Sequence, residues 1–352
     1  MGARVAGNRI GSIDALRGIA ALCVCVQHGV QPIVTHPATA PAVRRWLSML
    51  TVDGFDLGRY GVILFFLISG YVIPFSLRGT HALPRFAITR VLRLYPAFWL
   101  SVIAVVMTSA AMPSVARFAA NLTMAPAMFG AAPVSGVYWT LFVEFVFYLL
   151  CAALFATGQL RRTSAVFVLG LGCAALPLMG VVLRGAPIVY LGAHLSFLFA
   201  GTLMRFASEQ RTSAARLRAT ALTLIALAAM PILAQQPDHS FTLSTPLGVT
   251  LAGGAAVASF VALHDRAGLA SPILLRLGAI SYALYLFHVP VARVAERAIA
   301  PASLPAALLY LTLMLGGSLM LAAAVYTWLE RPMIARGKRW SPGHRLGVAV
   351  AP

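Results

Sequence analysis

The stretch that decides the fold is IDALRGIAALCVCVQHG, residues 13–29. Its apolar run has the length that a helix needs to cross the hydrocarbon core of a bilayer. The run nevertheless holds Arg17 and His28. An arginine at the centre of a span costs roughly 2.5–3.5 kcal/mol on insertion scales. Ionisable groups at this depth usually face a protein interior or a water-filled cavity, so the stretch predicts a functional site inside a membrane helix.

The composition of the whole chain agrees with a membrane protein. Of its 352 residues, 60% are hydrophobic and only 10% are charged, whereas a soluble domain is about a quarter charged. The net charge of +18 raises the question of nucleic-acid binding. However, the basic residues lie between apolar runs rather than on one tail or face, which is typical of topology signals. We therefore expect no nucleic-acid partner.

Ten apolar runs of roughly 17 to 25 residues mark candidate membrane spans. They cover about 12–31, 58–77, 94–112, 137–157, 163–183, 187–204, 219–235, 245–263, 278–293 and 304–328. No linker between them is long enough to separate two domains. The sequence therefore predicts one all-α domain over residues 1–352, a polytopic membrane bundle of about ten transmembrane helices.

The basic residues also predict the orientation, because cytoplasmic loops carry an excess of Lys and Arg. With the N-terminus inside, 19 of the 27 Lys and Arg residues fall in cytoplasmic segments and seven in external ones. Both termini are therefore predicted to lie in the cytoplasm.

Arg17 and His28 are predicted to share one helix face. They are eleven residues apart, close to three turns, which separates them by roughly 16 Å along the axis. Asp14, three residues before Arg17, can pair with it on the same face. Arg17 alone could snorkel to the interface, and His28 alone could be a hydrogen-bonded structural histidine. Together they indicate a polar stripe that runs from the cytoplasmic side to beyond the midplane.

The segment HALPRFAITRVLRLYP, residues 81–96, is a candidate anion site. On a helix, Arg90 and Arg93 lie on neighbouring turns, and Arg85 precedes them. Guanidinium groups suit phosphate because they form bidentate, charge-assisted hydrogen bonds. The alternative is that the positive-inside rule alone explains these arginines.

Two further spans carry candidate catalytic groups. Glu144 in VYWTLFVEFVFYLL, residues 137–150, is predicted at a depth similar to that of His28, where a carboxylate can orient an imidazole. The alternative for Glu144 is a structural ion pair. In ISYALYLFHVPV, residues 280–291, His288 and the preceding Tyr285 are predicted to line an acceptor side, or else to be structural.

The predicted outer loop WLSMLTVDGFDLGRYG, residues 46–61, holds Trp46, Asp53 and Asp56. These side chains are candidates for contacting a sugar, although loops are polar in any case. The four cysteines all lie inside apolar runs and show neither a disulfide framework nor metal-ligand spacing. We expect no metal.

Six motifs in order resemble those of the membrane acyltransferases of the type three family. They are IDALRGIAALCVCVQH, with its Arg and His separated by ten residues, GVILFFLISGYVIPFSL (61–77), the Arg90-to-Arg93 spacing before LYP, VYWTLFVEFVFYLL, ISYALYLFHVPV and YTWLERP (326–332). Each motif is loose by itself, but the six together span essentially the whole chain.

The resemblance implies transfer of an acyl group, usually from cytoplasmic acetyl-CoA, to a hydroxyl of a carbohydrate or another acceptor. It implies that His28 is the catalytic histidine with Arg17 as its partner, and that Arg90 and Arg93 contact the donor's phosphates. Family members that modify peptidoglycan often carry an extra extracytoplasmic hydrolase-like domain. Without one in this sequence, we expect transfer to finish in the membrane domain or on a separate partner.

We therefore expect a membrane O-acyltransferase, with acyl-CoA as donor substrate and a polysaccharide or lipid-linked saccharide as acceptor, among the lipids of a bacterial inner membrane. Direct transfer and a covalent intermediate on His28 or Ser69 both stay open. The alternative is a proton-coupled transporter or exporter of a small anionic or sugar solute, because buried His, Glu and Arg suit that class too. No repeated half or matched pair of broken helices favours it.

Overall fold

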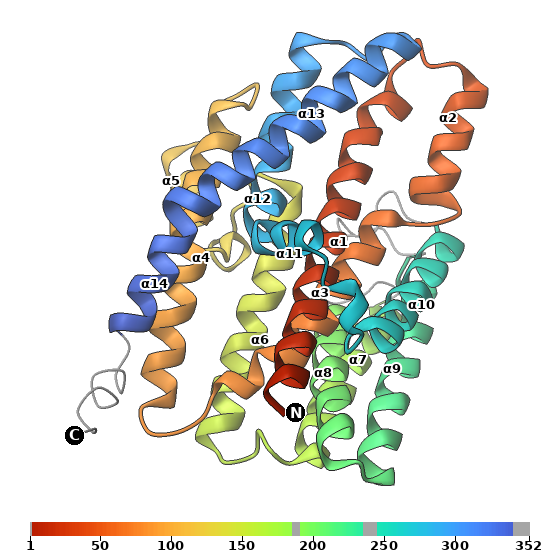
Figure 1. Ribbon diagram of the computed structural model, residues 1–352. Coiled ribbons are helices and arrows are strands. Elements are labelled where there is room, and N and C mark those ends of the chain that lie inside the picture. Colours follow the sequence, from red (N-terminus) through yellow and green to blue (C-terminus); the bar gives the residue numbers. More distant parts are fainter. Residues whose placement is uncertain (1, 185–190, 235–244, 341–352) are drawn as a thin grey trace.

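The computed structural model describes residues 2–184, 191–234 and 245–340, and within them the regular structure is helical, without strands (Figure 1). The α-helices in this part of the chain are α1 (Gly2–Thr35), α2 (Pro41–Ser48), α3 (Leu57–Val72), α4 (Ala82–Met107), α5 (Val115–Asn121), α6 (Trp139–Ala156), α7 (Thr163–Arg184), α8 (Leu191–Gln210), α9 (Ser213–Leu233), α10 (Pro246–Leu263), α11 (Pro272–Ala279), α12 (Ser281–Ala298), α13 (Leu304–Val325) and α14 (Arg331–Trp340). The π-helical turns η1 (Met49–Asp53) and η6 (Tyr326–Glu330) follow α2 and α13, and the 3-10 turn η2 (Pro74–Ser76) follows α3.

Seven helical segments of the described chain are long and apolar enough to cross a membrane. They are Gly11–Thr35, Pro41–Ser76, Ala82–Met107, Gly136–Ala156, Ser213–Ile232, Pro246–Leu263 and Leu304–Trp340. An eighth span results if α11 and α12, which meet at a 68° bend, count as one. The protein is thus an all-helical integral membrane protein, as the sequence predicted.

The expected count of ten spans is not confirmed. The run predicted at 187–204 forms α8 from Leu191 onward, but this helix carries the polar side chains His194, Ser196 and Thr202 in the protein interior. A helix surrounded by other helices can hold such groups because they meet protein partners instead of lipid. In α7, the apolar stretch Thr163–Pro177 is shorter than a full span.

The helix ends divide the molecule into two sides. Figure 1 shows the start of α1, the end of α14 and the α3–α4, α6–α7 and α8–α9 connections on its lower side, which we call the N-terminal side. The opposite side, which holds the α1–α2 and α12–α13 connections, is the far side. The connections on the N-terminal side carry several of the basic residues, so the positive-inside rule makes this the cytoplasmic side. That orientation stays a prediction.

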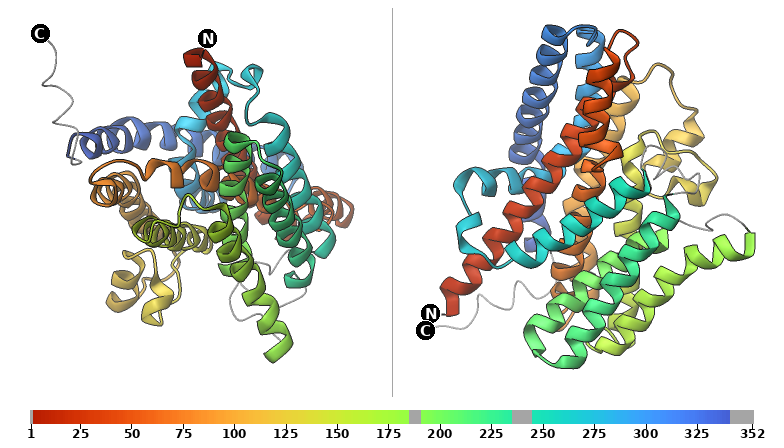
Figure 2. Two further views of the ribbon diagram at one scale, coloured as in Figure 1. Left: turned by 90° about the horizontal axis from the view of Figure 1, so that it is seen from below. Right: turned by 90° about the vertical axis from the view of Figure 1, so that its right-hand side faces the viewer.

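Two glycine contacts set the close packing at the centre of the bundle. A Cβ atom added to Gly70 of α3 would lie 1.8 Å from the Leu198 carbonyl oxygen of α8, and one added to Gly201 would lie 2.2 Å from that of Leu67. Only residues without a side chain allow the two backbones to approach so closely. The α3 helix is therefore fixed against α8, with α7 and α9 packed on the other faces of α8 (Figure 2).

The predicted outer loop at 46–61 is mostly helical, which corrects the expectation of a polar loop. Residues 46–53 belong to α2 and η1, and α3 begins at Leu57. Asp56 caps α3, because its Oδ1 accepts a hydrogen bond of 2.7 Å from the backbone N–H of Arg59. An aspartate at this position is a common start signal for a helix.

Candidate functional site

A cavity of about 660 Å³ lies among α1, α3, α4, α6, α8 and α12. The residues that line it change from charged to apolar along α3. Around η2 and the N-terminal side it is bordered by charged residues, whereas Val62, Phe65 and Phe66 line it further into the bundle. The ten helical rises from Val62 to Val72 correspond to about 15 Å along the helix axis. The cavity is therefore elongated and polar at one end only.

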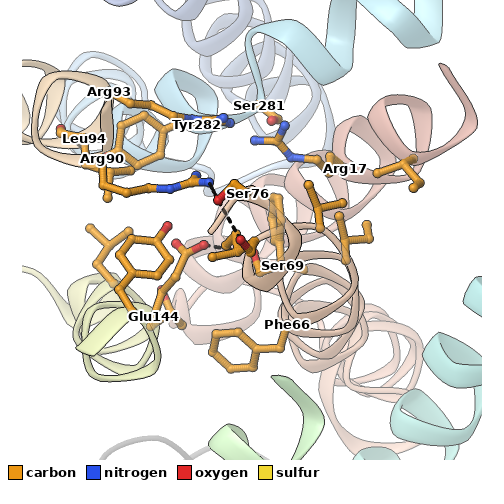
Figure 3. Close-up of a pocket in the computed structure, with 18 of the residues that line it drawn as sticks. Arg17, Phe66, Ser69, Ser76, Arg90, Arg93, Leu94, Glu144, Ser281 and Tyr282 are labelled. Atoms are coloured by element: carbon orange, nitrogen blue, oxygen red, sulfur yellow. Dashed lines mark hydrogen bonds between the residues drawn. The ribbon is translucent and has the colours of Figure 1, made fainter. Parts of the chain in front are cut away.

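Five arginines from different parts of the chain line the charged end. They are Arg17 of α1, Arg78 after η2, Arg90 and Arg93 of α4, and Arg205 of α8. Figure 3 shows three of them, Arg17, Arg90 and Arg93. Two carboxylates, Asp14 and Glu144, line it as well. The excess of positive charge in a partly enclosed space favours a polyanionic ligand.

Arg90 is held in place by its neighbours. Its Nη2 donates to Ser76 Oγ at 3.3 Å, and its guanidinium lies over the rings of Phe86 and Tyr148 at 5.2 and 5.4 Å. The Nε of Arg90 is buried and has no hydrogen-bond partner. Arg93, one turn along, makes no hydrogen bond or ion pair with the described residues. Both guanidinium groups thus keep donors for a ligand.

Arg17 has the partner that the sequence predicted, whereas Glu144 has a different one. Arg17 Nη1 lies 3.5 Å from Asp14 Oδ1, which confirms the predicted pair on one helix face. Glu144 Oε1 accepts a hydrogen bond of 2.9 Å from Ser69 Oγ (Figure 3). Glu144 therefore belongs to the charged end of the cavity and does not orient His28, because α6 turns this side chain toward α3 and α4.

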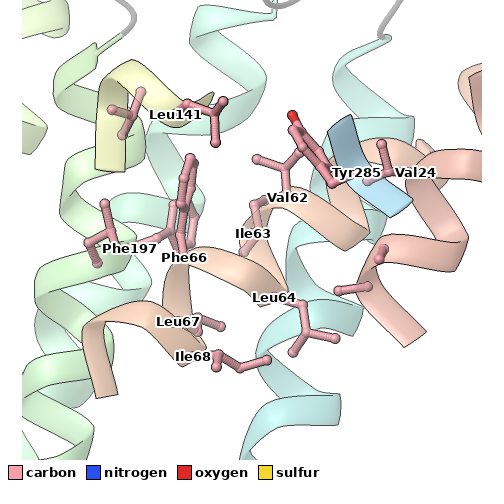
Figure 4. Packing of buried hydrophobic residues seen from close by; sticks show 14 of the residues in the cluster. Val24, Val62, Ile63, Leu64, Phe66, Leu67, Ile68, Leu141, Phe197 and Tyr285 are labelled. Carbon is pink, nitrogen blue, oxygen red and sulfur yellow. The ribbon is translucent and has the colours of Figure 1, made fainter. Parts of the chain in front are cut away.

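Tyr285 closes the apolar end of the cavity. Its hydroxyl donates to the Val137 carbonyl oxygen at 2.8 Å and shares a hydrogen bond of 2.6 Å with Thr140 Oγ1. Its ring lies against the edge of Phe65, with 6.0 Å between centroids. Figure 4 shows Tyr285 within the packed apolar cluster that also includes Val62. Tyr285 therefore forms part of the wall at this end of the cavity, and its hydrogen bonds hold it there.

A pair of histidines lies just beyond this wall. His288 follows Tyr285 by one helical turn, with 5.9 Å between the two rings, and its own ring lies 5.0 Å from that of His28. The Nδ1 atoms of His28 and His288 lie 2.9 and 3.2 Å from the carbonyl oxygens of Val24 and Leu284. A carbonyl can only accept, so each Nδ1 carries the proton and each Nε2 keeps its lone pair. The Nε2 of His288 is buried without a partner.

Several predicted site residues lie away from this arrangement. Arg85 donates to the backbone oxygen of Arg78 and does not line the cavity. Trp46 and Asp53 are exposed on α2 and η1. Asp56 is only 2% exposed and forms an ion pair with Arg59 at 3.8 Å, so it is a structural cap and not a surface group for a sugar.

Sequence reasoning missed two cavity residues, Arg78 and Arg205. Arg78 follows the motif of residues 61–77, and Arg205 lies near the end of α8. The sequence indicates only that both arginines are cytoplasmic, because sequence spacing does not predict which residues of separate helices come together. Arg205 is fixed by an ion pair with Glu209 and by the rings of Tyr71 and Phe75, at 5.1 and 5.0 Å from its guanidinium.

Fold and cavity together define an integral membrane protein with a cationic internal cavity beside a histidine pair. A family model described as the acyltransferase domain of the type three acyltransferases matches residues 10–327. The chain therefore belongs to this family and is a membrane acyltransferase, which does not favour the transporter alternative. No curated protein and no solved structure matches it.

Proposed function

We propose that the protein transfers an acyl group, acetyl foremost, from acyl-CoA to a hydroxyl of a carbohydrate or lipid-linked saccharide. The observation that carries this proposal is the graded cavity, with five arginines at one end and an apolar wall beside two imidazoles at the other. Acyl-CoA has the matching form, since its phosphates are at one end and its thioester at the other.

The arginine cluster supports binding of the donor phosphates. Arg93 and the Nε of Arg90 have unused donors, and Arg17 lies across the cavity from them. About 16 Å along α1 separates Arg17 from His28. The pantetheine arm of acyl-CoA is the part that spans this distance, so the phosphates stay among the arginines while the thioester approaches the histidines. In this arrangement, Arg17 serves the donor rather than acting on His28 directly.

The histidine pair supports direct transfer by base catalysis. The acceptor oxygen attacks the thioester carbonyl while Nε2 of His28 takes the hydroxyl proton. The carbon–sulfur bond then breaks, the oxygen ester forms, and the thiolate of CoA leaves with the proton that His28 releases. The unpaired Nε2 of His288 offers an acceptor for a hydrogen bond from a neighbouring hydroxyl of the acceptor molecule, and this contact aligns the attacking oxygen.

The two sides of the bundle support a transfer between compartments. The arginines lie toward the basic N-terminal side, which we propose faces the cytoplasm, where acyl-CoA is made. The acceptor then reaches the histidines from the far side. This arrangement suits O-acetylation of a surface or lipid-linked saccharide at a bacterial inner membrane.

The first test is binding of acetyl-CoA to the purified protein in detergent, measured by isothermal titration. The double variant Arg90→Ala/Arg93→Ala should weaken binding by about 100-fold, because two charge-assisted contacts to phosphate are lost. Arg85→Ala is the matched control, since this arginine lies on the same helix but outside the cavity. It should leave the affinity unchanged.

Two results of this titration would contradict the proposal. If the folded wild-type protein binds neither acetyl-CoA nor CoA, the donor assignment is wrong. If Arg85→Ala weakens binding as much as the double variant, the effect comes from general surface charge and not from the cavity.

A further inference from the structure

The apolar end of the cavity is lined by buried side chains, which limit the acyl groups that it can hold. Its lining residues Val62, Phe66, Thr140, Leu141 and Tyr285 are each at most 7% exposed. By contrast, the Arg17 and Arg205 side chains at the charged end are 23% and 28% exposed. The charged end of the cavity is therefore the more accessible one, and the apolar end is enclosed by protein.

The wall at this end is held by hydrogen bonds as well as by packing. The Tyr285 hydroxyl joins α12 to the start of α6 through the Val137 carbonyl and the Thr140 hydroxyl. The ring cannot swing away without leaving these polar groups unpaired in the protein interior, which is costly. The ring also lies 5.9 Å from that of His288, so Tyr285 borders both the cavity and the histidine pair.

We propose that Tyr285, fixed by Thr140 and the Val137 carbonyl, sets the length of the acyl group that this protein accepts. This inference rests on the proposed acyl-CoA binding. A ligand whose phosphates are held by the arginines carries its acyl group toward the enclosed end. A short acyl group is accommodated in front of the ring, whereas a long chain has to displace the phenol and break both hydrogen bonds. Tyr285 thus determines the specificity for acyl-chain length, whereas His28 remains the general base of the transfer.

The test compares the affinities of CoA, acetyl-CoA and octanoyl-CoA by isothermal titration. The wild-type protein should bind octanoyl-CoA about tenfold more weakly than acetyl-CoA, because the extra methylenes have no space. Tyr285→Ala should remove this difference, since the lost ring leaves a volume that methylene groups fill favourably. Leu141→Ala enlarges the same end and should act in the same direction if Tyr285→Ala does not fold.

Tyr310→Ala is the matched control, because Tyr310 is another fully buried tyrosine, on α13, and does not line the cavity. It should leave the ratio of the two affinities unchanged. The inference is overturned if the wild type binds both thioesters equally, or if the variants at the enclosed end leave the ratio unchanged. If CoA itself does not bind, the proposed function fails instead, so the two failures are distinguishable.

Discussion

His194 and His288 are both fully buried, yet their surroundings are opposite. Nη1 of Arg59 lies 2.8 Å from Nε2 of His194, and the ring of Trp139 lies 4.6 Å from the imidazole. Arginine has only donors, so Nε2 of His194 is an acceptor that is already used. In His288 the same atom is also an acceptor, but it has no partner and its ring faces His28. The comparison teaches that a buried histidine is a reactive candidate when its lone pair is left available, not simply when it is buried.

The comparison is tested most strongly at His28, the partner of His288. His28→Ala should lower acyl transfer by about 10³-fold, because a general base contributes on this order. Membranes from cells that express the protein are incubated with acetyl-CoA radiolabelled in its acetyl group, and the label that becomes bound to the membrane material is counted. The acceptor therefore need not be known. Acetyl-CoA binding and thermal stability in detergent should stay near wild type. Retained transfer would show that His28 is not the base.

The other side of the comparison is tested at His194. His194→Phe removes the hydrogen-bond acceptor that Nη1 of Arg59 contacts in the protein interior. We expect the free energy of unfolding to fall by about 2 kcal/mol, seen as a lower thermal midpoint in detergent. Transfer per folded molecule should be unchanged. A loss of transfer without a loss of stability would place His194 in the chemistry and break the comparison.

The smallest expected effect concerns the unpaired nitrogen of His288. His288→Phe keeps the ring but removes the acceptor, and we expect transfer to fall by about tenfold with unchanged acetyl-CoA binding. His288→Gln places an amide oxygen near the former Nε2 and should recover most of the activity. If packing alone matters, the order is reversed, and the phenylalanine variant is the more active of the two.

Much of the site was predictable on single helices. The spacing of Arg17 and His28 and the pair of Arg90 and Arg93 follow from 3.6 residues per turn, and the structure keeps them so. The cap at Asp56 was also readable, because an aspartate before an apolar run is a helix start signal. The prediction that Asp56 contacts a sugar is therefore wrong, because its carboxylate caps α3.

Contacts between helices are the part of the site that the sequence does not predict. Depth in the membrane suggests that Glu144 lies beside His28, but depth does not determine which face of α6 meets which neighbour. The hydrogen bond to Ser69 places the carboxylate among the arginines instead. Arg78 and Arg205 reach the same cavity from segments more than 100 residues apart, which no local pattern records.

The amino-acid sequence is enough to identify a helical membrane protein, the residues that share a face of each helix, and motifs in the order of the type three acyltransferases. These properties depend on hydrophobicity and on local helical geometry, which neighbouring residues fix. Three features become visible in the folded protein alone: five arginines surround one cavity, Tyr285 lines it, and the lone pair of His288 is free while that of His194 is not. Such contacts depend on how helices approach and rotate against one another, and side-chain packing across the whole bundle sets that arrangement.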